Sequence, residues 1–299
     1  MKLKVATTQF QLRPERTFED FADHAQQIIG AVAGDGAEVV LLPELVTTGL
    51  LATHSEVERL TVRDLNAAYR TVFPAYTERF IHVMSELAAA HEIVIVAGSH
   101  YRRTPTGGYR NTAYVLHPDG RVEQQDKLHL IPEERLLGTE PGDDVLVTRI
   151  GSTKVAVQIC ADIEFPEVSR YLASQGVDLI LVPSLTWNRR GAQRVRYGAH
   201  ARSMENQIYV AVSTLVGTSG LPQDGAMYGT GNSFIAMPLE KRFGDNEGIA
   251  VAHPDDGVEG YVVGELDMER LAESRANPEP PGYRYRREDL YRRLTAGAH

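Results

Sequence analysis

The single cysteine of the chain, Cys160, lies where the sequence predicts that a core strand turns into a helix. The residues before it, 154–159, are rich in β-branched side chains and predict a buried strand. Pro166 and Glu167 then predict a helix start, because proline and an acid are both favoured in a first helical turn. Such a turn lifts a nucleophile off a sheet edge and directs backbone N–H groups toward it. A buried structural thiol is the alternative interpretation.

A carboxylate and an amine, Glu44 and Lys127, lie at two further predicted strand ends. A free thiol with a pKa of about 8.5 is only a few per cent thiolate at neutral pH, so a base such as Glu44 would help it to attack. Lys127 and the backbone N–H of Ala161 could stabilise the charge that develops on a carbonyl oxygen. Together these residues predict acyl transfer through a thioester. Taken alone, each charged residue could be an ordinary turn or surface residue.

The elements that must position these residues alternate along the chain. Apolar periodicity of three to four residues predicts helices, and short apolar or alternating runs predict strands. Helices are predicted at 18–32, 76–91, 168–175 and 189–207, and strands at 2–10, 39–42, 93–97, 111–117, 121–125, 145–150, 154–159, 179–182, 209–215, 232–237, 248–252 and 261–266. Two helix-covered sheets within one domain are the expected arrangement.

A hairpin turn at Pro118, Asp119 and Gly120 indicates that antiparallel strands lie beside the parallel units, so the sheets are expected to be mixed. We predict that the second hairpin strand continues through residues 124–130. Side-chain alternation along that strand would place Lys127 and His129 on one face.

Three blocks of sequence carry a family resemblance: LLPELVTTG around Glu44, DKLHLIPEER around Lys127 and VQICADIEFPE around Cys160. The segments LILVPSLTW, ARSMENQ and GNSFIAMP follow in the same order. In this combination the chain resembles the nitrilase superfamily of carbon-nitrogen hydrolases, in its amidase-like branch. One block alone would be weak evidence, whereas the three together are specific and span nearly the whole chain.

The resemblance implies an α/β fold, namely a four-layer αββα sandwich with two mixed β-sheets. Residues 1–275 would form this carbon-nitrogen hydrolase domain, and residues 276–299 would be a C-terminal arm of the same unit. Family members usually pair through helices, so a homodimer or a higher homo-oligomer is expected. The helix after Cys160 and the helix that ends in ARSMENQ would form the interface, with the arm reaching across.

The resemblance also implies a catalytic triad of Glu44, Lys127 and Cys160. The family often has a second glutamate a few residues after the lysine. Glu134 is the expected match, and Glu133 is the competing candidate.

The residues after the cysteine favour an amide substrate. Superfamily enzymes that act on nitriles usually have Trp and Glu there, whereas this chain has Ala161 and Asp162. The implied reaction is hydrolysis of a non-peptide carbon-nitrogen bond through a cysteine thioacyl intermediate, with release of ammonia or an amine. An N-carbamoyl amino acid or ureido hydrolase is the alternative, followed by a nitrilase or a catalytically silent binding member. Asp162 is expected to cap backbone N–H groups of the turn. Asp126 departs from the Arg that often precedes the lysine in amidase-type members.

Three residues are predicted to bind the substrate: Ala161, Trp187 and His129. Trp187 follows a strand end on the expected pocket side, and an arginine after it could pair with a substrate carboxylate or could simply be solvated. His129 lies two residues after Lys127. A different thiol hydrolase with His129 or His200 as its base is the minor alternative. The histidines show no HExxH or paired-ligand spacing, so no metal and no cofactor are expected.

The bulk composition points to a small-molecule amide or carbamoyl substrate. A formal net charge of -9 argues against nucleic-acid binding, which depends on clustered cations. No apolar stretch reaches the roughly 18 residues of a membrane span. A single cysteine excludes an intramolecular disulfide, and the first residues lack a secretory pattern. We therefore expect a cytoplasmic protein without a membrane partner.

Overall fold

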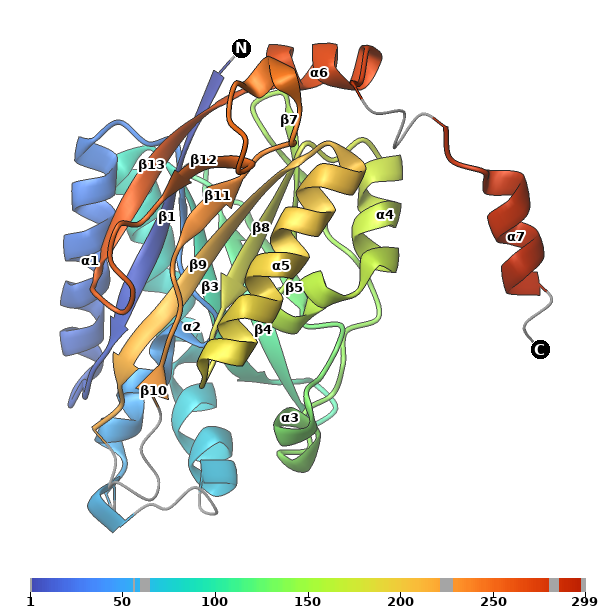
Figure 1. Ribbon diagram of the computed structural model, residues 1–299. Coiled ribbons are helices and arrows are strands. Elements are labelled where there is room, and N and C mark those ends of the chain that lie inside the picture. Colours follow the sequence, from blue (N-terminus) through green and yellow to red (C-terminus); the bar gives the residue numbers. More distant parts are fainter. Residues whose placement is uncertain (1, 56, 60–64, 221–227, 280–284, 297–299) are drawn as a thin grey trace.

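The computed structural model describes residues 2–55, 57–59, 65–220, 228–279 and 285–296 (Figure 1). In chain order the elements, with η for 3-10 helices, are β1 (Lys2–Leu12), α1 (Phe18–Gly34), β2 (Val39–Leu41), η1 (Val46–Thr53), η2 (Val57–Arg59), α2 (Leu65–His91), β3 (Val94–Arg103), β4 (Tyr109–Leu116), β5 (Val122–Asp126), α3 (Pro132–Leu136), β6 (Val147–Ile150), β7 (Thr153–Val157), η3 (Cys160–Glu164), α4 (Pro166–Ser174), β8 (Leu179–Ser184), α5 (Arg189–Asn206), β9 (Tyr209–Thr218), β10 (Tyr228–Gly229), β11 (Phe234–Ala236), η4 (Lys241–Phe243), β12 (Ile249–Ala252), β13 (Gly260–Asp267), α6 (Met268–Ala276) and α7 (Glu288–Ala296).

The strands follow the order β5-β4-β3-β2-β1-β9-β8-β7-β6, with β13 paired to β1, β10 and β11 to β9, and β12 to β11. β1 is where two halves of the sheet meet. Its residues 2–9 pair antiparallel with β13, and its residues 9–12 pair in parallel with β9. The α/β sandwich is confirmed with one difference: the two predicted sheets are halves of one hydrogen-bonded sheet, because β1 changes partner along its length.

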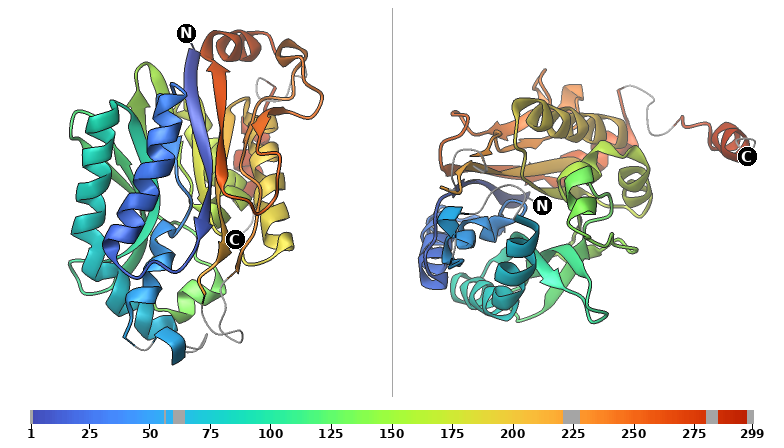
Figure 2. Two further views of the ribbon diagram at one scale, coloured as in Figure 1. Left: turned by 90° about the vertical axis from the view of Figure 1, so that its left-hand side faces the viewer. Right: turned by 90° about the horizontal axis from the view of Figure 1, so that it is seen from below.

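Helices cover the outer faces of both halves. α1 and α2 lie outside the half that contains β2 and β3, and α4 and α5 lie outside the half that contains β7 and β8 (Figure 2). Side chains alternate between the two faces of the sheet along β2 and the residue after it, which explains this cover. Val39 and Leu41 pack between the halves, whereas Val40 and Leu42 pack under α1 and α2. Each such side chain contributes about 1.5–3 kcal/mol by leaving water. This burial fixes the register of the strands whose ends carry the site.

The two strands that lead to Lys127 and Cys160 were predicted to extend too far. β5 ends at Asp126 rather than at residue 130, and β7 ends at Val157 rather than at residue 159. The N–H groups of Lys127 and Gln158 still donate to neighbouring strands, at the carbonyls of Asn111 and Leu181. Those of Leu128, His129 and Ile159 donate to the carboxylate of Asp162 instead. Lys127 and His129 therefore do not share one strand face.

The C-terminal residues form α6 and α7. Arg275 in α6 donates to the Asp178 carboxylate at 2.6 Å and to the carbonyl of Val177 at 2.8 Å, which ties this helix to the start of β8. No residue of α7 is buried, and this helix lies apart from the sandwich in Figure 1. The division at residues 275 and 276 stays a prediction.

Candidate active site

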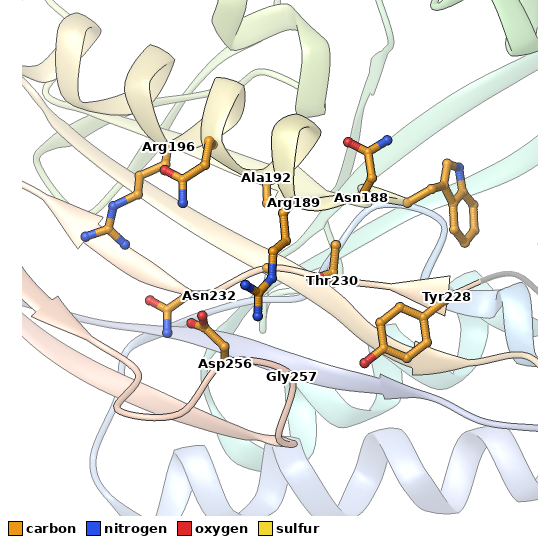
Figure 3. A pocket seen from close by; sticks show the side chains of 12 residues that line it. Asn188, Arg189, Ala192, Arg196, Tyr228, Thr230, Asn232, Asp256 and Gly257 are labelled. Atoms are coloured by element: carbon orange, nitrogen blue, oxygen red, sulfur yellow. The ribbon is translucent and has the colours of Figure 1, made fainter.

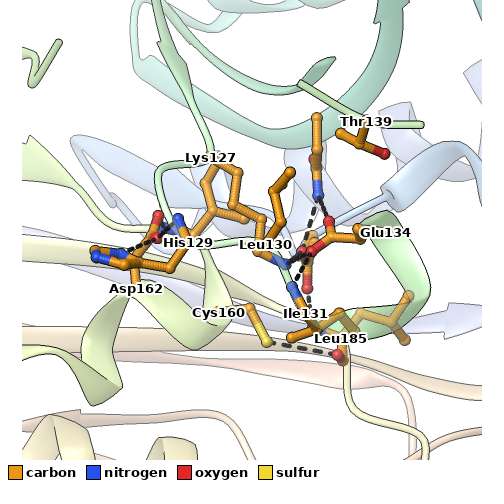
Figure 4. A network of polar contacts seen from close by, with 12 residues as sticks. Lys127, His129, Leu130, Ile131, Glu134, Thr139, Cys160, Asp162 and Leu185 are labelled. Carbon is orange, nitrogen blue, oxygen red and sulfur yellow. Dashed lines mark hydrogen bonds and ion pairs between the residues drawn. The ribbon is translucent and has the colours of Figure 1, made fainter. Parts of the chain in front are cut away.

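Glu44, Lys127 and Cys160 meet at one end of the sandwich. Glu44 follows β2, Lys127 follows β5 at once, and Cys160 begins η3 just after β7. All three side chains are buried. Figure 4 shows Lys127 and Cys160 in the same network of polar contacts.

Lys127 lies between two carboxylates. Its Nζ is 2.7 Å from Oε1 of Glu44 and 2.8 Å from Oε2 of Glu134. We call Glu44, Lys127 and Glu134 the lysine cluster. The side-chain amide of Asn111 donates to both carboxylates, at 2.9 Å and 3.0 Å. A lysine with three donors thus spends two of them on fixed partners and is held in one orientation.

The backbone of Leu185 joins Glu44 to the cysteine. Its N–H donates to Oε2 of Glu44 at 3.0 Å, and its carbonyl accepts from the Cys160 thiol at 3.5 Å. The hydroxyl of Ser184 donates to the same sulfur at 3.4 Å. Because one residue contacts both groups, the carboxylate and the thiol are neighbours.

Burial and charge shift the pKa values of these groups. Burial raises the pKa of the Cys160 thiol, and the Glu44 carboxylate raises it further. Burial also raises the pKa of Glu44, although the positive charge of Lys127 opposes this. For Lys127, burial lowers the pKa, but the charges of Glu44 and Glu134 outweigh burial and raise it overall. The resting site therefore holds a neutral thiol, a carboxylate that is more basic than usual and a charged lysine.

Two turns at the site have unusual backbone conformations. Cys160 has a φ of 48°, and Leu45, which follows Glu44, has a φ of 49°. Residues with a Cβ rarely occupy this left-handed region, and such strain is typical of functional turns. Asp162 accepts from the N–H of Ile159 at 3.0 Å, so it caps the turn as predicted.

The choice between the two candidate second glutamates follows from α3. Its start at Pro132 places Glu134 on the inner side, where its carboxylate also accepts from the N–H of Ile131 at 3.1 Å. Glu134 is buried, whereas Glu133 is exposed. Glu134 is thus the glutamate that joins the lysine cluster.

The three residues predicted to bind substrate lie in different places. Ala161 is buried directly after the cysteine in η3. Trp187 lines a cavity of about 390 Å³ beside the start of α5. Figure 3 shows Arg189, Arg196 and Asn232 around this cavity. The ring of His129 instead hydrogen-bonds Asp162 and lies outside the lysine cluster (Figure 4).

Sequence reasoning missed Asn111, Ser184 and Leu185. Asn111 is a polar residue in the hairpin strand, and Ser184 ends the apolar strand β8, so both offered a weak signal. The part of Leu185 that matters is its backbone, which every residue type has. No sequence pattern could have identified it.

The described residues contain neither a metal-binding cluster nor a membrane-spanning helix. Within the described ranges, no group of three or more His, Cys, Asp or Glu side chains is arranged to hold a metal ion. None of the helices that the structure describes combines the length and apolar character needed to cross a lipid bilayer.

Comparison with protein families matches a carbon-nitrogen hydrolase model to residues 4–276. The chain belongs to the carbon-nitrogen hydrolase family. The match covers every residue of the lysine cluster and the cysteine, so this hydrolase has the family's architecture throughout its sandwich.

Individual proteins that are similar to this chain include a probable hydrolase and amidases. "Probable hydrolase YhcX" of Bacillus subtilis is 34% identical over 97% of this chain, which spans about half (54%) of the Bacillus protein. "Omega-amidase NIT2-A" of Xenopus laevis is 28% identical over 97% of both chains. Among solved structures, an amidase from Nesterenkonia sp. AN1 with acrylamide added to its active site cysteine has a TM-score of 0.72 at 21% identity, covering 98% of this chain and 99% of its own. That last likeness establishes the fold.

Proposed function

We propose that the protein hydrolyses a small linear amide through a thioacyl intermediate on Cys160, with Glu44 as general base and acid. The observation that carries this proposal is the backbone of Leu185, which contacts both the Glu44 carboxylate and the Cys160 thiol. A more basic carboxylate beside a neutral thiol suits a step in which the proton leaves sulfur as sulfur attacks carbon.

In the first half of the reaction, Cys160 Sγ adds to the amide carbonyl carbon and its proton passes to Glu44. Negative charge then develops on the carbonyl oxygen. The third N–H of Lys127 and the backbone N–H of Ala161 stabilise that charge, which is typically worth about 100-fold to 1000-fold per donor. Glu44 returns the proton to the nitrogen, the carbon-nitrogen bond breaks and the amine or ammonia leaves.

In the second half, water attacks the thioester carbonyl while Glu44 takes a proton from it. The carbon-sulfur bond breaks, the carboxylic acid leaves and the thiol regains its proton. Throughout, Glu134 acts with Glu44 to keep Lys127 charged and oriented, and Asn111 fixes the two carboxylates. One carboxylate can serve each proton transfer because the steps occur in sequence.

We further propose that the substrate carries a carboxylate at a distance from its amide. The cavity lined by Trp187 also contains Arg189 and Arg196 against one acid, Asp256, so its net charge is positive. Arginine is the side chain best suited to bind a carboxylate. The similarity to an omega-amidase supports a substrate of this kind. An N-carbamoyl amino acid is the second candidate, since it also bears a carboxylate, and its hydrolysis would add carbon dioxide to the products.

A homodimer through the outer face of α4 and α5 is part of the proposal. Large apolar side chains of these helices, and that of Phe165 just before α4, are exposed: Phe165 (42%), Tyr171 (51%), Tyr197 (68%) and Met204 (54%). Monomeric proteins rarely expose such a group on one face. Sedimentation should give twice the chain mass, and Tyr197→Glu should give a monomer. A monomeric parent protein would contradict the dimer. Val258→Glu, at a side chain 54% exposed on another surface, is the matched control.

The test of the reaction is a substrate screen with product and adduct analysis. Omega-amides, N-carbamoyl amino acids and nitriles are incubated with the purified protein, ammonia and carbon dioxide are quantified, and the acyl-enzyme is trapped for intact mass spectrometry. We expect ammonia without carbon dioxide and an acyl adduct at Cys160 that is missing in Cys160→Ala. Turnover by Cys160→Ala at the parent rate would refute the mechanism.

We place this chemistry in the cytoplasm, where thiols stay reduced.

A further inference from the structure

Asp162 is a fully buried carboxylate that accepts four hydrogen bonds. Its Oδ2 accepts from the N–H groups of Ile159 at 3.0 Å and Leu128 at 3.3 Å. Its Oδ1 accepts from the N–H of His129 at 2.7 Å and from the ring Nδ1 of the same residue at 2.9 Å. One donor precedes the nucleophile, and the other three belong to the two residues after the lysine.

The strand order shows why this link matters. β5, which leads to Lys127, is the first strand of the order, and β7, which leads to Cys160, is the last but one, so the two share no ladder. The sheet alone therefore does not set the distance between the ammonium and the sulfur. Asp162 supplies a direct connection between the two strand ends across the interior of the sandwich.

His129 completes the connection. Its ring stacks on Phe165, with centroids 3.7 Å apart and planes 7° apart, and Phe165 follows η3. The imidazole is thus held from two sides by the segment that carries the nucleophile. This placement accounts for the ring's direction away from the lysine cluster.

We infer that Asp162 is a positioning residue that fixes Lys127 relative to Cys160, with His129 as its support. The inference rests on the proposed function, because it concerns the geometry of the same reaction. Loss of the link allows the ammonium to shift from the oxyanion position. A displacement of about 1 Å in an active site costs about 100-fold in rate.

The experiment compares Asp162→Asn with Asp178→Asn. Asp178 is a matched control because it accepts from the N–H of Lys154 at 3.1 Å, at the other end of β7. We expect Asp162→Asn to lower kcat about 100-fold while KM changes less than threefold, since positioning acts on the transition state. Asp178→Asn should keep the parent kcat even where its thermal midpoint falls. Parent kcat in a folded Asp162→Asn would overturn the inference.

A second variant, His129→Phe, and a second measurement, the alkylation rate of Cys160, complete the test of the positioning role. His129→Phe keeps the stacking on Phe165 and removes one donor to Asp162, and we expect about a threefold to tenfold loss in kcat. If Asp162→Asn does not fold, parent kcat in His129→Phe overturns the inference. The rate of Cys160 alkylation by iodoacetamide is measured in both variants as a readout independent of turnover. An active Cys160→Ala would refute the proposed function itself, whereas an inactive Cys160→Ala with an unaffected Asp162→Asn would refute only the positioning role.

Discussion

Two regions of this molecule each contain a buried cation between two carboxylates, yet only one of them has the groups for a catalytic reaction. The lysine cluster is the first. The second, which we call the histidine cluster, contains Glu15, His24 and Glu259: Nδ1 of His24 is 2.9 Å from Glu15 and Nε2 is 2.5 Å from Glu259. Both cations are about 2% exposed. The two clusters therefore share an arrangement of charges, and they differ in the groups that lie next to it.

The histidine cluster adjoins apolar and backbone groups. The His24 ring stacks on Phe10 at 4.0 Å, and Glu259 also accepts from the N–H of Gln11 at 2.9 Å. These contacts tie α1 to the loop before β13. Burial lowers the pKa of His24, but hydrogen bonds to Glu15 and Glu259 outweigh it and raise the pKa overall. No nucleophile lies among these contacts, so the cluster acts as a structural tie.

The lysine cluster adjoins a thiol through Leu185, and its cation keeps an N–H for a further partner. A buried ion pair is thus not itself a sign of catalysis. What distinguishes the two regions is a reactive atom within reach of a carboxylate whose pKa is raised.

Removing the nucleophile should have the largest effect. Cys160→Ala is expected to lower kcat by at least about 10⁴-fold, because no thioester can form. Circular dichroism and the thermal midpoint should remain close to those of the parent, since the side chain is small. Measurable acyl-enzyme in this variant would contradict the assignment of Cys160.

Removing the base should come next. Glu44→Gln keeps the shape of the side chain but cannot accept the thiol proton, and we expect kcat to fall about 10² to 10⁴-fold. Stopped-flow measurement of acyl-enzyme formation checks whether the first step is the one that slows. A variant slowed only in thioester hydrolysis would limit the role of Glu44 to the second half.

Breaking the histidine cluster should change stability and leave catalysis intact. His24→Ala leaves the buried Glu15 and the half-buried Glu259 without their cation, so we expect a loss of about 3 kcal/mol in the free energy of unfolding. Urea denaturation measures it, and kcat at 25 °C should stay within about twofold of the parent. The control is His100→Ala, because His100 is also buried but hydrogen-bonds the hydroxyls of Thr47 and Thr77 instead of carboxylates. A large loss of kcat in His24→Ala would mean that the two regions are coupled.

The smallest effect is in the pH dependence, where the clusters should respond in opposite directions. His24 has a pKa raised above its ordinary 6.5, so its contribution to stability is complete below pH 6.5 and is lost as pH rises through the folded-state pKa. The difference in urea midpoint between parent and His24→Ala should shrink over that range. The control His100 has a pKa lowered to about 3 and is neutral in the folded protein, so above pH 6.5 its variant should show a constant difference.

Activity should instead be lost toward acid. Glu44 must be ionised to accept a proton, and its pKa is raised above 4.5, so kcat/KM should fall as pH drops through that higher value. The kcat/KM profile of the parent measures this limb. An acid limb at or below the ordinary carboxyl pKa would contradict the role of Glu44 as base.

The sequence alone predicted the elements that carry Glu44, Lys127 and Cys160, and the family resemblance favoured Glu134 over its neighbour. These features depend on short-range periodicity and on compact motifs, which are written in neighbouring residues. The structure brings these four residues together. The end of β5 was mispredicted for the same reason. The alternation of side chains continues in the sequence past Asp126, but the N–H groups of Leu128 and His129 donate to the distant carboxylate of Asp162.

Tertiary structure alone decided the rest. Asp162 accepts hydrogen bonds from the N–H groups of residues 33 and 34 positions away. The backbone of Leu185 contacts both Glu44 and Cys160 across the sandwich. Contacts of this kind depend on which strand ends meet in space, and backbone groups are the same in every residue. The sequence determined which side chains are available for the reaction, and the packing of the two sheet halves decided which of them touch.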